Sequence, residues 1–138
     1  MNYKEKDDAY ATDKKWDKAE NTLAKHIRVT DGVSNLHFAY NSIIGYTYKQ
    51  RKVDEYVLDR CLEYCFEDIQ LLPKFKKVCN NEFNDFETLT TPSIGRSIRI
   101  FKDKKIYNKL KRILDKIIDL YRGTEKEEYY QKELAKIK

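Results

Sequence analysis

The sequence predicts an all-α protein of five or six helices, arranged as stacked antiparallel helical hairpins. Its 138 residues include only two prolines and four glycines, too few for the many turns of a β-protein. Apolar residues recur every three or four positions through most of the chain, which is the spacing of one helix face. Hydrophobic residues make up 41% of the chain, so a single domain of this length can bury its own core.

The first expected helix covers residues 13–28, where Trp16, Leu23 and Ile27 share one face. The first hairpin then covers 36–73. We expect its second helix to end near Pro73, because proline removes a backbone donor and disfavours helix in the residue before it.

Gly45 stands inside the first helix of that hairpin. Glycine in a helix interior costs about 1 kcal/mol relative to alanine. We explain its presence by close packing, since two helices of a hairpin approach closely where one of them presents a small side chain.

The second half of the chain begins with 74–91, which we expect to be a loop or a short helix held to the core by phenylalanine rings. Pro92 is suited to the first position of a helix, and it opens a second hairpin over 92–122. A C-terminal helix over 124–138 completes a single all-α domain spanning residues 1–138.

The basic residues are unevenly distributed. Residues 1–90 hold 14 Lys and Arg against 16 Asp and Glu, whereas 91–138 hold 14 against 7. The excess is concentrated in 96–112, which contains eight cations and one acid. Apart from Arg99 and Lys102, the cations of this basic patch are Arg96, Lys104, Lys105, Lys109, Lys111 and Arg112.

No catalytic residue is predicted, because the chain has none of the phosphate-binding, nucleophile-elbow or metalloprotease patterns. Cys61 and Cys65 could share a helix face, but further metal ligands at suitable spacing are missing, and we assign them to core packing. We therefore expect no enzyme, no metal and no cofactor. A charged N-terminus and an odd number of cysteines indicate a cytoplasmic protein with no membrane partner.

The helix that contains Gly45 resembles the tetratricopeptide repeat. Asn41-x2-Ile44-Gly45-x2-Tyr48 is similar to W-x2-L-G-x2-Y, the first-helix pattern of that repeat, at three of four positions. The second helix fits more loosely, as does the second hairpin. Residues 35–138 also look like small tetratricopeptide-like proteins of low-GC bacteria and their mobile elements.

The resemblance implies a degenerate repeat fold in which the first helix of each hairpin lines a concave groove. Such grooves usually bind peptides or helices of other proteins. Carried over position by position, the partner-binding residues would be Ser42, Tyr46, Lys49, Gln50, Arg99 and Lys102.

These observations predict a non-enzymatic protein–protein interaction module that binds a partner, such as an acidic protein, through the groove and the adjacent basic face. Two alternatives stay open. One is a phage or mobile-element inhibitor of a host protein. The other is an accessory protein that binds nucleic acid without sequence preference, since eight cations could neutralise several phosphates.

Overall fold

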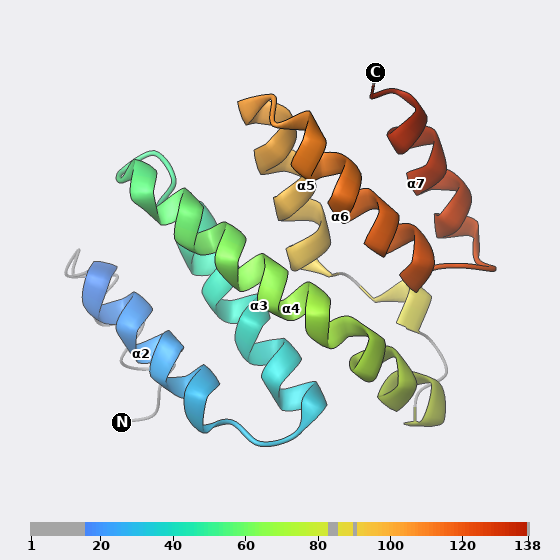
Figure 1. The fold of residues 1–138 in the computed structure, drawn as a ribbon. Coiled ribbons are helices and arrows are strands. Elements are labelled where there is room, and N and C mark those ends of the chain that lie inside the picture. Colours follow the sequence, from blue (N-terminus) through green and yellow to red (C-terminus); the bar gives the residue numbers. More distant parts are fainter. Residues whose placement is uncertain (1–15, 83–85, 90, 138) are drawn as a thin grey trace.

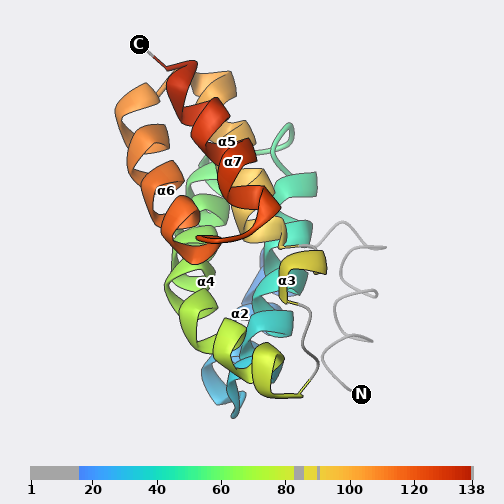
Figure 2. The same cartoon turned by 90° about the vertical axis from the view of Figure 1, so that its right-hand side faces the viewer.

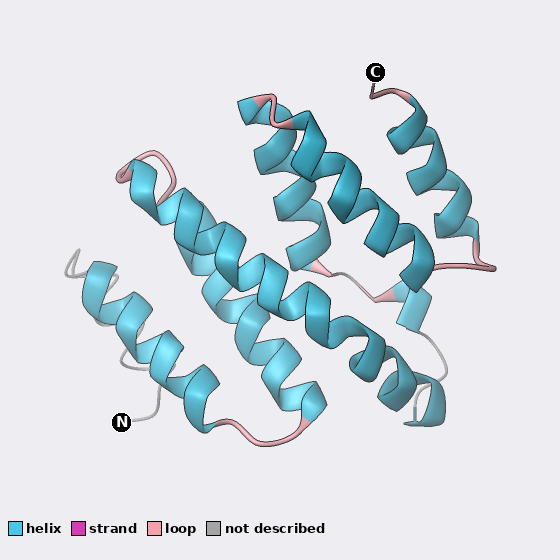
Figure 3. Ribbon diagram, viewed as in Figure 1, coloured by secondary structure: helices cyan, strands magenta, loops and turns pink. Residues whose placement is uncertain are grey.

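The computed structural model describes residues 16–82, 86–89 and 91–137. Their regular elements are six α-helices and one short 3₁₀ turn, with no strand among the described residues (Figure 3). The all-α prediction is therefore confirmed. The helices are α2 (Trp16–Val29), α3 (Val33–Lys49), α4 (Glu55–Glu82), α5 (Pro92–Lys104), α6 (Tyr107–Leu120) and α7 (Glu125–Ala135), and the 3₁₀ turn is η1 (Phe86–Thr88).

The helices stack as consecutive hairpins. Each packs against its neighbour in the chain from α2 to α7, and α3 also packs against α5. Figures 1 and 2 show α3 and α5 in one layer and α4 and α6 in the other. The core fills the space between these two layers.

Helix α3 is the central element, because α2, α4 and α5 all pack against it. The apolar face with Tyr40, Ile43 and Ile44 is buried, but so are His37 and Thr47. Burial around so much of its circumference follows from having neighbours on several sides, and a one-sided apolar stripe does not predict it.

Helix α4 continues through Pro73 to Glu82, so the prediction that it ends near Pro73 is wrong. The stripe of Ile69 and Leu72 goes on beyond the proline at Phe75 and Cys79, all of them buried. Proline inside a helix costs about 3 kcal/mol, whereas each large apolar side chain that becomes buried contributes about 1.5–3 kcal/mol. Tertiary packing therefore outweighs the local cost.

The connection after α4 is held by aromatic rings, as expected. Phe86 of η1 is buried, with its ring centroid 6.0 Å from that of Phe75 and 5.4 Å from that of Tyr121. The stack extends from Tyr121 to Tyr130 of α7, with 5.8 Å between centroids. Residues 74–82 thus form the end of α4, and η1 is a short turn further along the same segment.

Gly45 does not mark a close approach of two helices. A Cβ atom built on it would meet nothing within 4 Å beyond its own helix backbone and chain neighbours. The packing explanation from the sequence is therefore wrong: α3 and α4 are in contact, but the contact is made by other positions along α3.

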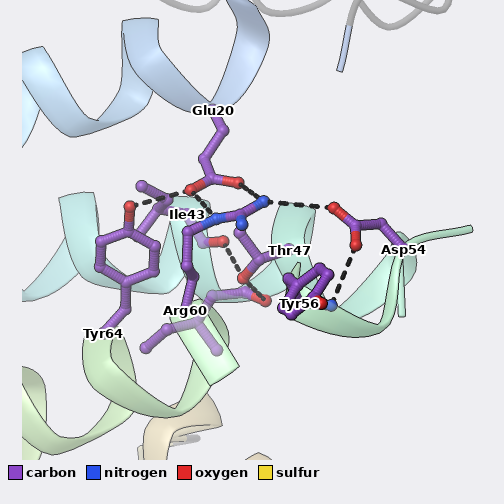
Figure 4. Close-up of polar contacts among 8 residues, drawn as sticks. Glu20, Ile43, Thr47, Asp54, Tyr56, Arg60 and Tyr64 are labelled. Atoms are coloured by element: carbon purple, nitrogen blue, oxygen red, sulfur yellow. Dashed lines mark hydrogen bonds and ion pairs between the residues drawn. The ribbon is translucent and has the colours of Figure 1, made fainter. Parts of the chain in front are cut away.

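Helix α2 is fixed to α4 by a partly buried ionic contact. Figure 4 shows Glu20 pointing toward Arg60 and Tyr64. Arg60 donates two hydrogen bonds to the carboxylate, at 2.7 and 3.0 Å, and the Tyr64 hydroxyl donates a third at 3.1 Å. Burial, with the nearby Glu20 charge, raises the pKa of Tyr64, so its hydroxyl keeps the proton that it donates.

The last two helices form the end of the stack. Helix α6 buries Leu110, Leu114 and Ile117, the regular stripe that the sequence shows. Helix α7 contains no fully buried residue and contacts α6 through partly buried side chains. No described helix is long and apolar enough to cross a bilayer.

Candidate functional site

The six residues carried over from the repeat resemblance do not form one surface. Tyr46 is only 9% exposed and belongs to the core, and Gln50 is 8% exposed. The prediction that Tyr46 lines an open groove is therefore wrong, because the central position of α3 buries that side. Ser42 lies instead in a hollow of about 540 Å³ between α2 and α3, where its hydroxyl donates to the Phe38 carbonyl.

The remaining three residues of that set are exposed cations, and two of them bind acids of the same chain. Arg99 donates to Asp103 at 3.2 Å, and Lys102 donates to Glu133 at 3.0 Å. The bond from Lys102 lowers the pKa of Glu133. Lys49 is exposed near the end of α3.

The basic patch predicted over 96–112 is divided by the fold. Arg96 lies over the Tyr48 ring with 4.2 Å from its guanidinium carbon to the ring centroid, and Lys104 is 3.6 Å from an Asp59 oxygen. Lys105 ends α5 in the left-handed conformation, at φ +58°. Only two of the six patch cations line the groove that α6 forms with α4, and these are Lys109 and Arg112.

That groove runs between α4 and α6, which lie side by side (Figure 1). It consists of two hollows, of about 620 and 330 Å³, that share Ile69, Gln70 and Lys116. Both walls are helix faces with residues at three- and four-residue spacing. From α4 the lining residues are Phe66, Ile69, Gln70, Pro73, Lys76, Lys77 and Asn80, and from α6 they are Lys109, Arg112, Ile113, Lys116, Asp119 and Leu120.

The groove is strongly basic. It is lined by five cations and one carboxylate, and that carboxylate, Asp119, already pairs with Arg122. Lys76 donates to the Leu120 carbonyl at 2.5 Å. The other four cations, which are Lys77, Lys109, Arg112 and Lys116, make no ion pair with any described residue.

The floor of the groove is apolar, and Pro73 lies at its middle. Ile69, Ile113 and Leu120 are buried beneath it, whereas Phe66 is partly exposed and Pro73 exposed. Proline has no N–H, so the carbonyl of Ile69 lacks its usual helical donor. The site thus combines apolar contact area with four cations that make no ion pair among the described residues.

A second polar cluster is buried at the junction of three helices. His37 Nδ1 of α3 lies 2.8 Å from Asp68 Oδ1 of α4, and the Ser93 hydroxyl of α5 donates to Asp68 Oδ2 at 2.6 Å. All three residues are at most 1% exposed. The carboxylate separates the serine from the histidine, so the cluster lacks the hydroxyl–imidazole contact that activates a serine nucleophile. It links α3, α4 and α5 through side-chain hydrogen bonds.

The cysteines lie in the core. Cys61, Cys65 and Cys79 are free thiols, each at most 1% exposed. The neighbouring Cys61 thiol and burial raise the pKa of Cys65, which keeps that thiol protonated. Among the described residues, no group of three or more His, Cys, Asp and Glu side chains could hold a metal ion.

Sequence reasoning missed Lys76, Lys77 and Lys116 as functional residues. The expected helix end at Pro73 placed the two former lysines in a segment predicted to be a loop or a short helix. A signal was present, because Lys109, Arg112 and Lys116 stand at i, i+3 and i+7 and therefore share a helix face.

Comparison of the chain with known proteins finds no matching family model, curated protein or solved structure.

Proposed function

We propose that this chain is a non-enzymatic protein–protein interaction module that binds an acidic partner protein through the groove between α4 and α6. The observation that carries the proposal is the groove itself, where four cations that make no ion pair with any described residue surround an apolar floor. Unpaired cations attract and orient an acidic surface, and the apolar floor supplies the contact area that contributes most of the affinity.

A tetratricopeptide-like architecture remains part of this proposal. The pairs α3–α4 and α5–α6 pack as successive hairpins, which supports the resemblance. The proposed binding surface differs from the one that the resemblance implies. It uses the second helix of each hairpin, because the first helix of the first hairpin has Tyr46 and Gln50 buried.

A protein partner suits this groove better than nucleic acid does. A nucleic-acid backbone would use the cations but would leave the apolar floor largely without complementary contacts. The basic segment that favoured nucleic acid is also divided, since Lys104 pairs with Asp59 and Arg96 stacks on Tyr48.

The test is a comparison of three forms of the protein in affinity capture from the lysate of a low-GC bacterium, carried out once with nuclease treatment of the lysate and once without it. The first is the native chain. The second carries Lys109→Glu, Arg112→Glu and Lys116→Glu in the groove. The third is a control with the same change of net charge at exposed cations elsewhere, namely Lys25→Glu, Arg28→Glu and Lys52→Glu.

We expect a protein that the native chain and the control retain and the groove variant does not. Its affinity for each purified form, measured by calorimetry, should fall at least about tenfold for the groove variant alone, a change of about 1.4 kcal/mol. Retention by all three forms would refute the groove as the binding site. Recovery only without nuclease would transfer the function to nucleic acid. The identity of the protein would decide between an adaptor and an inhibitor of a host protein.

A further inference from the structure

We infer that the occupant of the groove between α4 and α6 is an acidic amphipathic α-helix of the partner protein. This inference rests on the proposed function and adds the secondary structure and the residue pattern of the bound segment. Three features of the groove support it: its length, the chemistry of its walls and the distribution of its charges.

The length of the groove suits a short helix. Its α4 wall extends from Phe66 to Asn80, which corresponds to about 21 Å of helix at 1.5 Å per residue. An occupant lying along it would contribute about four turns, or about 14 residues. Helices that bind in apolar grooves present anchors at i, i+3 or i+4, and i+7.

The walls favour a helix over an extended peptide. An extended peptide needs backbone donors and acceptors from the surface that it binds, because its own are unpaired. Both walls here are α-helices, whose interior backbone groups are already bonded to each other. The Ile69 carbonyl, freed by Pro73, is the single acceptor that the proline adds. A helical occupant pairs its own backbone N–H and C=O groups, so it needs no backbone hydrogen bonds from the walls of the groove.

The charges define the pattern of the occupant. Lys76 and Lys77 stand on the α4 wall, and Lys109, Arg112 and Lys116 stand on the α6 wall, with apolar side chains between them. The matching helix has an apolar stripe with Asp or Glu on both sides of it.

The experiment uses four synthetic 16-residue peptides with fluorescent labels and blocked termini. The first has leucines at helical spacing, flanked by glutamates on both sides. The second has the same composition with the leucines distributed around the helix, and the third has lysine in place of glutamate. The fourth repeats the first with one central proline, which breaks the helix but keeps charge and composition nearly unchanged. Binding to the native protein is measured by fluorescence anisotropy.

We expect the first peptide to bind at least about tenfold more tightly than the second and the fourth, and the third to show no binding. Its affinity should also fall at least about tenfold for the groove variant and stay the same for the control variant. The comparison among peptides uses only the native chain, so it does not depend on the folding of any variant.

Equal binding of the first, second and fourth peptides would overturn the inference, because an acidic chain of any shape would then be sufficient. Absence of binding by all four would overturn it as well, and so would groove-dependent binding of a labelled DNA duplex in their place. In the first two cases, a partner captured from the lysate in a groove-dependent way would leave the proposed function standing. If groove dependence fails in both experiments, the proposed function falls together with the helix.

Discussion

Replacing Asp68 by alanine should strongly destabilise the fold. The side chain is fully buried on α4 and bonds to His37 of α3 and to Ser93 of α5. Its removal leaves two buried polar groups without a partner, at about 1–3 kcal/mol each. We therefore expect a loss of about 4 kcal/mol, a large part of the 5–15 kcal/mol by which domains are stable.

Urea unfolding followed by far-UV circular dichroism measures this loss as a lower midpoint concentration of urea, while the dependence of the unfolding free energy on urea concentration stays unchanged. Ser93→Ala is the companion variant, and it should cost about 1.5–3 kcal/mol because the hydroxyl bonds to a carboxylate. In the double variant the two losses should not add, since alanine at position 93 removes a hydroxyl that the Asp68 change has already left unpaired.

The reasoning is refuted if Asp68→Ala unfolds within about 1 kcal/mol of the native chain and the double variant is additive. That result would mean that His37 and Ser93 find other partners. If Asp68→Ala does not fold, the test rests on Ser93→Ala alone. A loss of less than about 0.5 kcal/mol in its free energy of unfolding would contradict a stabilising network.

Three further predictions concern other parts of the structure. Gly45→Ala should raise the free energy of unfolding by about 1 kcal/mol, because the new methyl group meets nothing within 4 Å. Gly32→Ala should lower the free energy of unfolding, because Gly32 has φ +90°, where alanine is strained. Urea titration of both variants measures these two changes. Glu133 has a folded-state pKa below its ordinary value because Lys102 donates to it, so its contribution to stability is present above the ordinary carboxyl pKa and is lost as pH falls through the lowered one. Thermal melts from neutral to acid pH should accordingly show a smaller acid loss for Glu133→Gln, and an unchanged loss would contradict this assignment. Glu20→Ala should lower the free energy of unfolding by about 1–3 kcal/mol, because Arg60 and Tyr64 of α4 lose the carboxylate to which they donate. Amide hydrogen exchange should then rise first in α2. A uniform rise along the chain would instead indicate that α2 is held mainly by its apolar face.

Local pattern was sufficient to predict which segments are helical. The stripes in α2, α3 and α6 are regular, and Pro92 correctly marks the start of α5. The predicted end of α4 at Pro73 was wrong, although the apolar spacing at Phe75 and Cys79 continued to indicate helix. Two local signals disagreed there, and only packing against the rest of the core decided between them.

The candidate site was less accessible to sequence reasoning. The sequence identified Lys109 and Arg112 as members of a basic segment, but it could not tell which cations pair within the chain. Asp103 is close to Arg99 in sequence, whereas Asp59 reaches Lys104 only through the fold. The repeat pattern placed Tyr46 on a surface because it describes one hairpin and not the helices that cover it.

By itself the sequence determined the fold class, most helix boundaries and the basic character of the last third, because each depends on residues close together in the chain. Only the tertiary structure decided that α4 passes through Pro73, that Gly45 is not at a helix contact and that cations without an ion pair among the described residues meet between α4 and α6. The physical reason is the same for all three. Burial, ion pairing and the shape of a groove depend on distances between residues far apart in sequence, and helical periodicity contains no information about those distances.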